Sequence, residues 1–333
     1  MILIFSIKHD VSTNMVMDWL EYYGEKVVRI NGDEQLYSFH YADDNGVYFQ
    51  HNVNGNIINL LDFSSCWWRK SGLRVPTSYI DWDQTISAIN NSKLNHINGL
   101  VEGFLKQELY TLHEYILNKI YSTIPINLGS PLYDLNRLKT LNIARSHGLN
   151  VPTYRIVSNS SQLKEFGGLN NSVITKSIGN GLYNVIGDER FFSYTEILPK
   201  SFIENDENIK LLPSLLMFYI EKKFEIRAFY IDGHFFSMAI LSQTSEQSKI
   251  DYRKKPPTEQ IPVQLPHEIE KKLSGVFIEL GLNTGSADLI VTPEDRYYFL
   301  EINPVGQFGM TSIPCNYNIE KTIARYLKYG KIE

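Results

Sequence analysis

The chain is poor in several features that mark particular classes of protein. Its 333 residues include only two cysteines, Cys66 and Cys315, far apart and outside any C-x-x-C spacing. This argues against a disulfide framework and a zinc site, and it fits a reducing cytoplasm. The apolar start at residues 1–7 stops at Lys8, too early for a signal-peptide core or a transmembrane helix. We therefore expect a cytoplasmic protein with no membrane partner.

Positive charge and the common phosphate-binding motifs are also scarce. A formal net charge of −5 argues against general binding to nucleic acid. No G-x-G-x-x-G occupies the first predicted strand-to-helix turn at residues 8–13, and the chain contains no G-x-x-x-x-G-K-[ST]. The composition itself is ordinary, with 43% hydrophobic and 21% charged residues. Such a chain can bury two or three cores.

The order of the predicted elements indicates an α/β (α+β) protein in three parts. A strand at 2–7, a helix with apolar residues at helical spacing up to Tyr23, and a strand at 27–30 open the chain. A long helical run over 92–121 follows, with an apolar stripe typical of a core or a subunit interface. Proline and glycine interrupt the pattern near 126–131. We predict an N-terminal α/β domain at 1–128, a central domain at 129–215 and a C-terminal antiparallel-sheet domain at 216–333.

A hairpin near the C-terminus carries the most informative pattern. If residues 293–296 form its turn, Thr292 faces Tyr297, and the register places Asp288 opposite Glu301 with Asn303 on the same face. Opposed carboxylates repel each other, so this pairing favours a cation between them. Oxygen ligands without His or Cys suit Mg²⁺. Two solvent-exposed carboxylates would be the simpler interpretation of this pattern alone, but the rest of the chain favours a metal site.

Two lysines earlier in the chain suit phosphate binding. Lys139 leaves a predicted helix beside its apolar stripe, and Lys176 ends an apolar strand that runs into a loop with two glycines, 179–181. A lysine in this setting, together with the N–H groups of the loop, can contact phosphate oxygens. For either lysine alone, exposure to solvent is the simpler interpretation.

A second predicted hairpin, 218–231 and 234–241, turns at Asp232-Gly233. Strand alternation places Lys223, Glu225 and Arg227 on one face, which is either solvent-exposed or the floor of a ligand site. The polar segment 243–260 that follows is predicted to be a loop able to place Arg253 over a phosphate.

These pieces, in this order, resemble the ATP-grasp superfamily over about residues 130–315. The resemblance consists of a lysine on a helix, a lysine on the next strand, a hinge of Glu-Lys-Lys-Phe-Glu-Ile-Arg form, and an Asp…Glu-x-Asn hairpin ending in Asn-Pro-x-Gly. Residues 1–6, 19–20, 29–33, 301–312 and 315–317 are in addition similar to the grasp-with-spasm peptide maturases, which belong with the graspetide macrocyclases, relatives of the microviridin ligases. This second resemblance spans the whole chain and implies the ATP-grasp fold.

The resemblance also implies roles for the candidate residues. The nucleotide would be bound by Lys139 and Lys176 at its phosphates, by the backbone of Glu221, Lys222 and Lys223 at adenine, and by either Glu221 or Glu225 at ribose. The metal ligands would be Asp288, Glu301 and Asn303. The catalytic residues, close to the transferred phosphate and the acceptor carboxylate, would be Arg227 and Arg253.

The implied reaction uses ATP and Mg²⁺ to activate Asp or Glu side chains of a ribosomally made precursor peptide as acyl phosphates. A Thr or Ser hydroxyl, or a Lys amine, of the same peptide then forms an ester or amide crosslink. The family implies leader recognition, for which 183–214 is the expected docking region unless it is an ordinary insert, and a homodimer. His147 and His234 are available as a general base, although a structural role is simpler for each. A RimK-like carboxylate–amine ligase with another acceptor and a non-catalytic ATP-binding module remain as alternatives.

Overall fold

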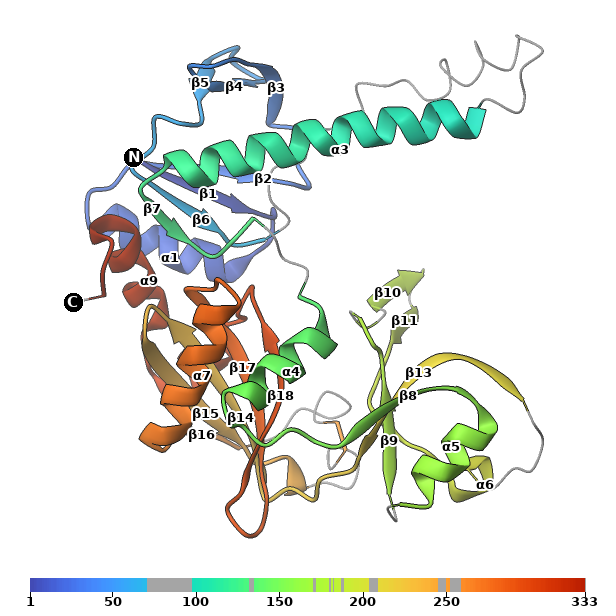
Figure 1. The fold of residues 1–333 in the computed structure, drawn as a ribbon. Helices are drawn as coiled ribbons and strands as arrows, with labels where there is room; N and C mark the ends of the chain where they lie inside the picture. Colours follow the sequence, from blue (N-terminus) through green and yellow to red (C-terminus); the bar gives the residue numbers. More distant parts are fainter. Residues whose placement is uncertain are drawn as a thin grey trace. The chain divides into compact units, whose positions relative to one another are not determined.

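The computed structural model describes residues 1–70, 98–131, 135–169, 172–179, 181, 183–186, 189–203, 209–244, 250–251 and 259–332. The chain forms two compact units: unit 1 comprises Met1–Tyr133 with Glu320–Glu333, and unit 2 comprises Asp134–Ile319 (Figure 1). Over the described ranges, no helix is both long enough and apolar enough to cross a membrane.

Unit 1 is built on a parallel sheet of order β2-β1-β6-β7, beside a small antiparallel sheet of order β3-β4-β5. Every residue of β1 is buried, as expected for a parallel strand covered on both faces. Helices α1 and α3 provide that cover from opposite faces (Figure 1). The described elements are β1 (Ile2–Ser6), α1 (Val11–Tyr22), β2 (Val27–Asn31), β3 (Tyr37–Ala42), β4 (Val47–His51), β5 (Ile57–Asn59), β6 (Ser65–Trp68), α3 (Asn98–Thr123), β7 (Ile126–Leu128) and nearly all of α9 (Ile319–Tyr329).

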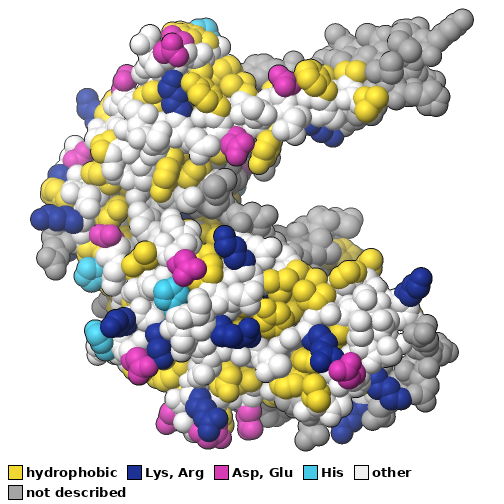
Figure 2. Space-filling view, in the orientation of Figure 1, with side chains coloured by type: hydrophobic (Ala, Val, Ile, Leu, Met, Phe, Trp, Pro, Cys, Tyr) yellow, Lys and Arg dark blue, Asp and Glu magenta, His cyan; other side chains and the backbone are white. Residues whose placement is uncertain are grey.

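The predicted α/β opening is confirmed, and the long helix behaves differently along its length. In the second half of α3, Ile116 and Ile120 pack in one core with Leu3 and Phe5 of β1. In the first half, Leu100 is 74% exposed and Phe104 is 62% exposed. Figure 2 shows hydrophobic side chains at intervals along this helix. The predicted stripe is therefore a core stripe from Leu109 onward; residues 92–97 of the prediction lie outside the described residues.

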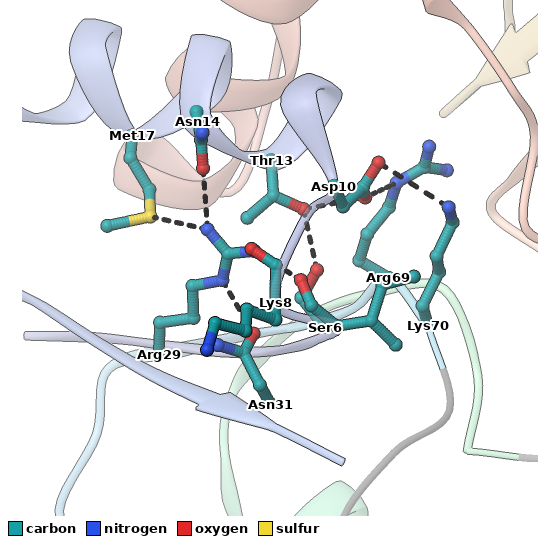
Figure 3. Close-up of polar contacts among 11 residues, drawn as sticks. Ser6, Lys8, Asp10, Thr13, Asn14, Met17, Arg29, Asn31, Arg69 and Lys70 are labelled. Carbon is teal, nitrogen blue, oxygen red and sulfur yellow. Dashed lines mark hydrogen bonds and ion pairs between the residues drawn. The ribbon is translucent and has the colours of Figure 1, made fainter. Parts of the chain in front are cut away.

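A polar cluster lies at the carboxyl ends of β1 and β6 (Figure 3). Asp10 accepts hydrogen bonds from Arg69 Nε at 2.9 Å and from Thr13 Oγ1 at 2.8 Å, and Lys70 Nζ lies 3.5 Å from its other oxygen. Burial acts to raise the pKa of Asp10, but Arg69, Thr13 and Lys70 together outweigh burial and lower the pKa below its usual value. Because Asp10 and Arg69 are both buried, the pair ties the β1–α1 turn to the end of β6.

Unit 2 contains two larger antiparallel sheets, of order β12-β9-β13-β8 and β16-β15-β14-β17-β18, and the hairpin β10-β11. Helices α4 and α7 pack on the five-stranded sheet through a shared apolar core. The described elements are α4 (Arg137–Ser146), β8 (Tyr154–Asn159), α5 (Ser160–Gly167), β9 (Val173–Lys176), β10 (Tyr183–Ile186), β11 (Glu189–Phe192), β12 (Glu196–Ile197), α6 (Lys200–Ile203), β13 (Lys210–Phe218), β14 (Phe224–Ile231), β15 (His234–Ile240), a 3₁₀ turn (Ser242–Thr244), β16 (Gln260–Val263), α7 (His267–Glu279), β17 (Thr284–Val291), β18 (Tyr297–Asn303) and α8 (Gly309–Cys315).

One predicted strand is divided in the structure. The prediction of a single strand over 218–231 is wrong, because β13 ends at Phe218 and β14 begins at Phe224. Residues 219–223 connect the four-stranded sheet to the five-stranded sheet. The alternation predicted for the second part is observed: Ile226 and Ala228 enter the apolar core, so Glu225 and Arg227 take the other face of the sheet.

The predicted pairing of Asp288 with Glu301 is observed, but the register of the hairpin near its turn differs from the prediction. Near the turn, Val291 pairs with Tyr297, one residue out of step with the predicted Thr292–Tyr297 pair. The register then shifts between Asp288 and Leu289, and Asp288 pairs with Glu301 as predicted. The shift leaves Leu300 as an extra residue on β18, which is a β-bulge. Without that bulge, Glu301 would point to the opposite face of the sheet.

Candidate functional site

A cavity of about 410 Å³ in unit 2 gathers residues from both sheets and from the connection between them. Its walls combine apolar side chains with an unusual density of charge. Among the described residues, the apolar lining includes Ile174, Met217, Phe218, Tyr219, Ile220, Ile290 and Leu300, and the charged lining comprises Arg137, Lys176, Lys222, Glu225, Arg227, Asp251, Asp288 and Glu301. An apolar pocket with a few converging charged groups is typical of a site for a small molecule.

Two basic side chains meet on one carboxylate oxygen of the hairpin. Lys176 Nζ and Arg137 Nη2 each lie 3.0 Å from Glu301 Oε2. The positive charge of Lys176 lowers the pKa of Glu301 to about 2, and Arg137 adds to this effect. Burial acts to raise the same pKa but is outweighed. The Glu301 side chain is 36% exposed, whereas Lys176 and Arg137 are mostly buried. Glu301 is therefore a carboxylate at neutral pH, and two cations beside it face the cavity.

The opposite strand carries a bidentate ion pair. Arg227 on β14 pairs across the sheet with Asp288 on β17. Its Nε lies 2.9 Å from Asp288 Oδ1 and its Nη2 lies 3.1 Å from Oδ2. Burial raises the pKa of Asp288 although Arg227 acts to lower it. The planar guanidinium fork matches two oxygens of one oxyanion.

Asn303 completes the set of oxygen donors that the hairpin presents. It lies two residues after Glu301, and its Oδ1 accepts a hydrogen bond from Val305 N at 3.1 Å. The following turn is tightly packed: Gly306 has a φ of 56°, and a Cβ there would lie 2.8 Å from Phe229. Glycine at this position thus permits the close packing that fixes Asn303.

This donor set fits a hard cation. In the part of the chain that the structure describes, no group of three or more His, Cys, Asp or Glu residues suits a metal. The hairpin instead offers two carboxylates and one amide oxygen, so further ligands have to come from phosphate or water. That composition is the one Mg²⁺ adopts when it binds with a nucleotide.

The connection between the sheets contains a buried charge network. Lys222 Nζ donates to Glu225 Oε1 at 2.7 Å and to the carbonyl of Ile250 at 3.1 Å, and Ser242 Oγ donates to the same Glu225 oxygen at 2.9 Å. Glu225 lines the cavity, whereas Glu221 is exposed and is absent from its lining. Of the two acids that the sequence left open for ribose, the geometry favours Glu225.

Three other sequence-based candidates lie away from the cavity or from the described residues. Lys223 pairs at the surface with Asp295 at 2.9 Å. Lys139 is exposed and is absent from the cavity lining. Arg253 lies outside the described residues. The two histidines considered as a base are also elsewhere: His147 bonds to Glu279 at 2.8 Å and His234 to the carbonyl of Asp232 at 3.2 Å.

Sequence reasoning missed Arg137, two residues before Lys139. Asn136 caps α4, and Arg137 is its first helical residue. Arg137 Nη1 donates to the carbonyls of Ser177 and, at 2.8 Å, of Gly179, so it grips the segment that follows β9. The usable signal was its place directly after the cap, because that end of the helix is the one that reaches the cavity.

Comparisons with known proteins establish the fold. No protein-family model matches the chain, and neither does any curated protein. One similar solved structure is an ATP-grasp ligase from Chryseobacterium gregarium that is associated with ribosomally made peptides and was solved with ADP, a leader and a core peptide. Its TM-score is 0.74 at 24% identity, and the match covers 98% of this chain and 96% of that one. The macrocyclase MdnC of Microcystis aeruginosa, solved with its precursor peptide MdnA, also has a TM-score of 0.74 at 24% identity, covering 99% of each chain. The ATP-grasp ligase PsnB, solved with a minimal precursor, Mg and ADP, reaches 0.71 at 14% identity, covering 100% of this chain and 97% of that one. The chain therefore has the ATP-grasp ligase fold, as predicted.

Proposed function

We propose that this protein is an ATP-dependent peptide ligase that crosslinks side chains of a ribosomally made precursor peptide. The observation that carries the proposal is the convergence of Arg137, Lys176 and Arg227 on the two carboxylates of the Asp288–Glu301 hairpin, inside a cavity with an apolar wall. Phosphoryl transfer needs this combination of cations, metal ligands and an apolar nucleotide site. The fold is that of ligases whose structures hold ADP and precursor peptides, which supports the peptide as substrate.

The nucleotide would enter between the two sheets. The connection at 219–222 offers backbone groups to the adenine edge, and Ile174, Ile290 and Leu300 provide apolar contact for its faces. Glu225, held by Lys222 and Ser242, is the acceptor for a ribose hydroxyl. Lys176 and Arg137 would contact the phosphates. Both now hold Glu301, so nucleotide binding has to move part of their charge from a carboxylate to phosphate oxygens.

Asp288, Glu301 and Asn303 would hold Mg²⁺. When bound, the ion would offset negative charge on the phosphates of ATP. The pKa of Glu301, at about 2, keeps its carboxylate in the form that binds a cation. The pairing of Asp288 with Glu301 across the sheet holds the two carboxylates in place before any ligand arrives.

The proposed reaction has two steps. An Asp or Glu carboxylate of the peptide attacks the γ-phosphorus of ATP, giving an acyl phosphate and ADP. A Thr or Ser hydroxyl, or a Lys amine, then attacks the acyl carbon; phosphate leaves, the attacking group loses its proton, and an ester or amide remains. Arg227 would hold the acceptor carboxylate and then the acyl phosphate, because its fork fits two oxygens of either group. Positioning supplies most of the rate in such a site.

Further elements of the prediction extend this proposal. We assign Arg253 to the transferred phosphate, and the region 183–214, which includes β10, β11, β12 and α6, to leader binding. A docked leader would raise the effective concentration of the core carboxylate at the site. A homodimer in the cytoplasm is the expected working form.

Intact mass spectrometry of a candidate precursor peptide tests the proposal. After incubation with the protein, ATP and Mg²⁺, the peptide should lose about 18 Da for each crosslink, with ADP formed in equal number. Arg227→Ala should bind ADP and leave the peptide unchanged. ADP release without mass loss in any peptide would point to a RimK-like ligase with another acceptor. Nucleotide binding without any turnover would overturn the ligase assignment and favour a binding module.

A further inference from the structure

Unit 1 contains a groove that the proposed reaction does not use. The α1/α9 groove, as we call it, has a volume of about 920 Å³ and is lined by Asp18, Trp19, Tyr22, Tyr23, Lys321, Arg325, Tyr329 and Lys331. Its walls come from helix α1 with the turn after it and from helix α9 with the residues after it. Half of the lining side chains are aromatic, and cations outnumber carboxylates by three to one.

The helical spacing explains how the groove is formed. Lys321, Arg325 and Tyr329 follow one another at intervals of four residues, so they share one stripe of α9. The opposite stripe is buried and includes Ile323 and Leu327. A helix that packs through one stripe and presents cations and an aromatic ring on another is suited to a partner on its outer side.

Contacts across the groove hold its two walls together. Lys321 Nζ on α9 lies 5.1 Å from the ring centroid of Trp19 on α1. Lys328 Nζ lies 5.6 Å from the ring of Tyr23 and donates to the Tyr23 carbonyl at 2.8 Å. These cation–π and hydrogen-bond contacts fix the relative position of the aromatic rings and the cations. The groove is therefore a preformed surface of unit 1.

Exposure of the aromatic side chains indicates that the groove serves for binding. Tyr22 is 77% exposed and Tyr329 is 52% exposed. Exposed aromatic rings add little to the stability of the folded chain, whereas Tyr, Trp and Arg are the residues that contribute most at interfaces. The ring of Trp19 lies 5.7 Å from that of Tyr22, so the rings form one continuous apolar surface beside the cations.

The charge of the groove selects the partner. The whole chain has a formal net charge of −5, so an excess of cations around one groove is a local feature of this surface. On the face shown in Figure 2, charges of both signs are interspersed. A nucleic acid would bind cations and rings as well, but Asp18 in the lining disfavours a backbone that carries a charge at every residue. A flexible peptide can place its acids beside the cations and avoid Asp18.

We propose that the α1/α9 groove binds an acidic peptide segment. Its Asp or Glu side chains pair with Lys321, Arg325 and Lys331, and its other side chains and backbone pack on Tyr22 and Tyr329. This binding activity lies entirely in unit 1 and does not depend on the ligase reaction proposed for unit 2.

Fluorescence anisotropy with labelled hexaglutamate tests this proposal on the full chain without nucleotide. We expect saturable binding at low salt that weakens steeply as salt rises. The double variant K321Q/R325Q should raise Kd by about 4- to 25-fold, since each exposed charged contact contributes about two- to fivefold. Lys8→Gln is the matched control, because Lys8 is an exposed lysine of unit 1 outside the groove; it should leave Kd unchanged. Tyr22→Ala, at an exposed position, should also weaken binding.

Several results would overturn the proposal. Equal binding of hexalysine, an unchanged Kd in both groove variants, or an equal loss in Lys8→Gln would show that the groove does not recognise acidic peptide. Tighter binding of an oligo-dT strand that displaces hexaglutamate would assign the groove to single-stranded nucleic acid instead. Concentration-dependent self-association that K321Q/R325Q abolishes, with no peptide binding, would assign it to a second copy of the chain.

Discussion

The sharpest test of the nucleotide site compares Arg137 with Lys139. Both are basic residues of α4, two positions apart, yet only Arg137 lines the cavity. We expect Arg137→Gln to weaken ADP binding by about 10- to 150-fold, because a lost hydrogen bond to a charged group costs about 1.5–3 kcal/mol. Lys139→Gln removes the same charge from the same helix at an exposed position. It should leave the affinity unchanged.

Stability has to be followed beside affinity in this pair. Arg137 donates to the carbonyls of Ser177 and Gly179 and to Glu301, so its loss removes real contacts. Two facts limit the cost. Glu301 keeps its contact with Lys176, and Arg137 Nε is buried with no hydrogen-bond partner among the described residues. We expect a loss of about 1–2 kcal/mol, which thermal denaturation would report as a fall of a few degrees in Tm.

Isothermal titration of ADP, with Mg²⁺ held constant, measures the affinities. The reasoning fails if Arg137→Gln binds ADP as the unchanged protein does, or if Lys139→Gln loses as much affinity as Arg137→Gln. A large loss of stability in Arg137→Gln would be separated from a direct effect by Arg137→Lys. That variant keeps a charge at the cavity, and it should recover part of the affinity.

Three further predictions follow from the ion pairs. Arg227→Ala should bind ADP, measured by titration, with an affinity within about threefold of the unchanged protein, because Arg227 would contact the nucleotide only at the transferred phosphate. Its crosslinking rate, measured by mass spectrometry, should fall by a factor of at least about 100, because Arg227 pairs with Asp288 at the proposed acceptor position. Glu301→Gln should abolish turnover, since a neutral amide replaces a carboxylate that two cations hold ionised; turnover near the normal rate would contradict the assigned role. The third concerns Asp10, whose pKa the folded state lowers: its ion-pair stabilisation is complete above the ordinary pKa of 3.8 and is lost as pH falls below it. Asp10→Asn should therefore lower Tm at pH 7, where Arg69 loses the carboxylate charge beside it, and flatten the decline of Tm below about pH 4. A decline as steep as in the unchanged protein would exclude Asp10 as its source.

The sequence predicted the architecture well because the relevant patterns are local. The α/β opening, the Asp232-Gly233 hairpin and the carboxylate hairpin follow from apolar spacing and turn residues close to them in the chain. The break at 219–223 was missed because the flanking residues continue the apolar pattern of a strand on both sides. Only the separation of the two sheets reveals it.

Site residues were predictable where strand alternation fixes a face. Glu225, Arg227 and Asp288 are examples, because each lies where β14 pairs with its neighbouring strands in a regular register. Arg137 and Lys139 show the limit of this reasoning. Which residue of the first helical turn reaches the cavity depends on the direction of the helix axis relative to the sheet, and local sequence patterns do not give that direction. The roles of Lys176, Asn303 and the other cavity residues stay predictions until ligand binding is measured. The boundaries proposed at 128 and 215 likewise remain predictions.

The bulge at Leu300 has a consequence for how this hairpin can vary among related proteins. The strand segments on its two sides are out of phase, so the turn at 293–296 and the carboxylate pair are set by separate local registers. A deletion of one residue between 297 and 300 would remove the bulge and join the two segments in one register, with Glu301 still opposite Asp288. The length of the turn, beyond the bulge, can drift with little effect on that pair. Inheritance should therefore preserve the spacing from Glu301 to Asn303 more strictly than the number of residues in the turn or the presence of the bulge.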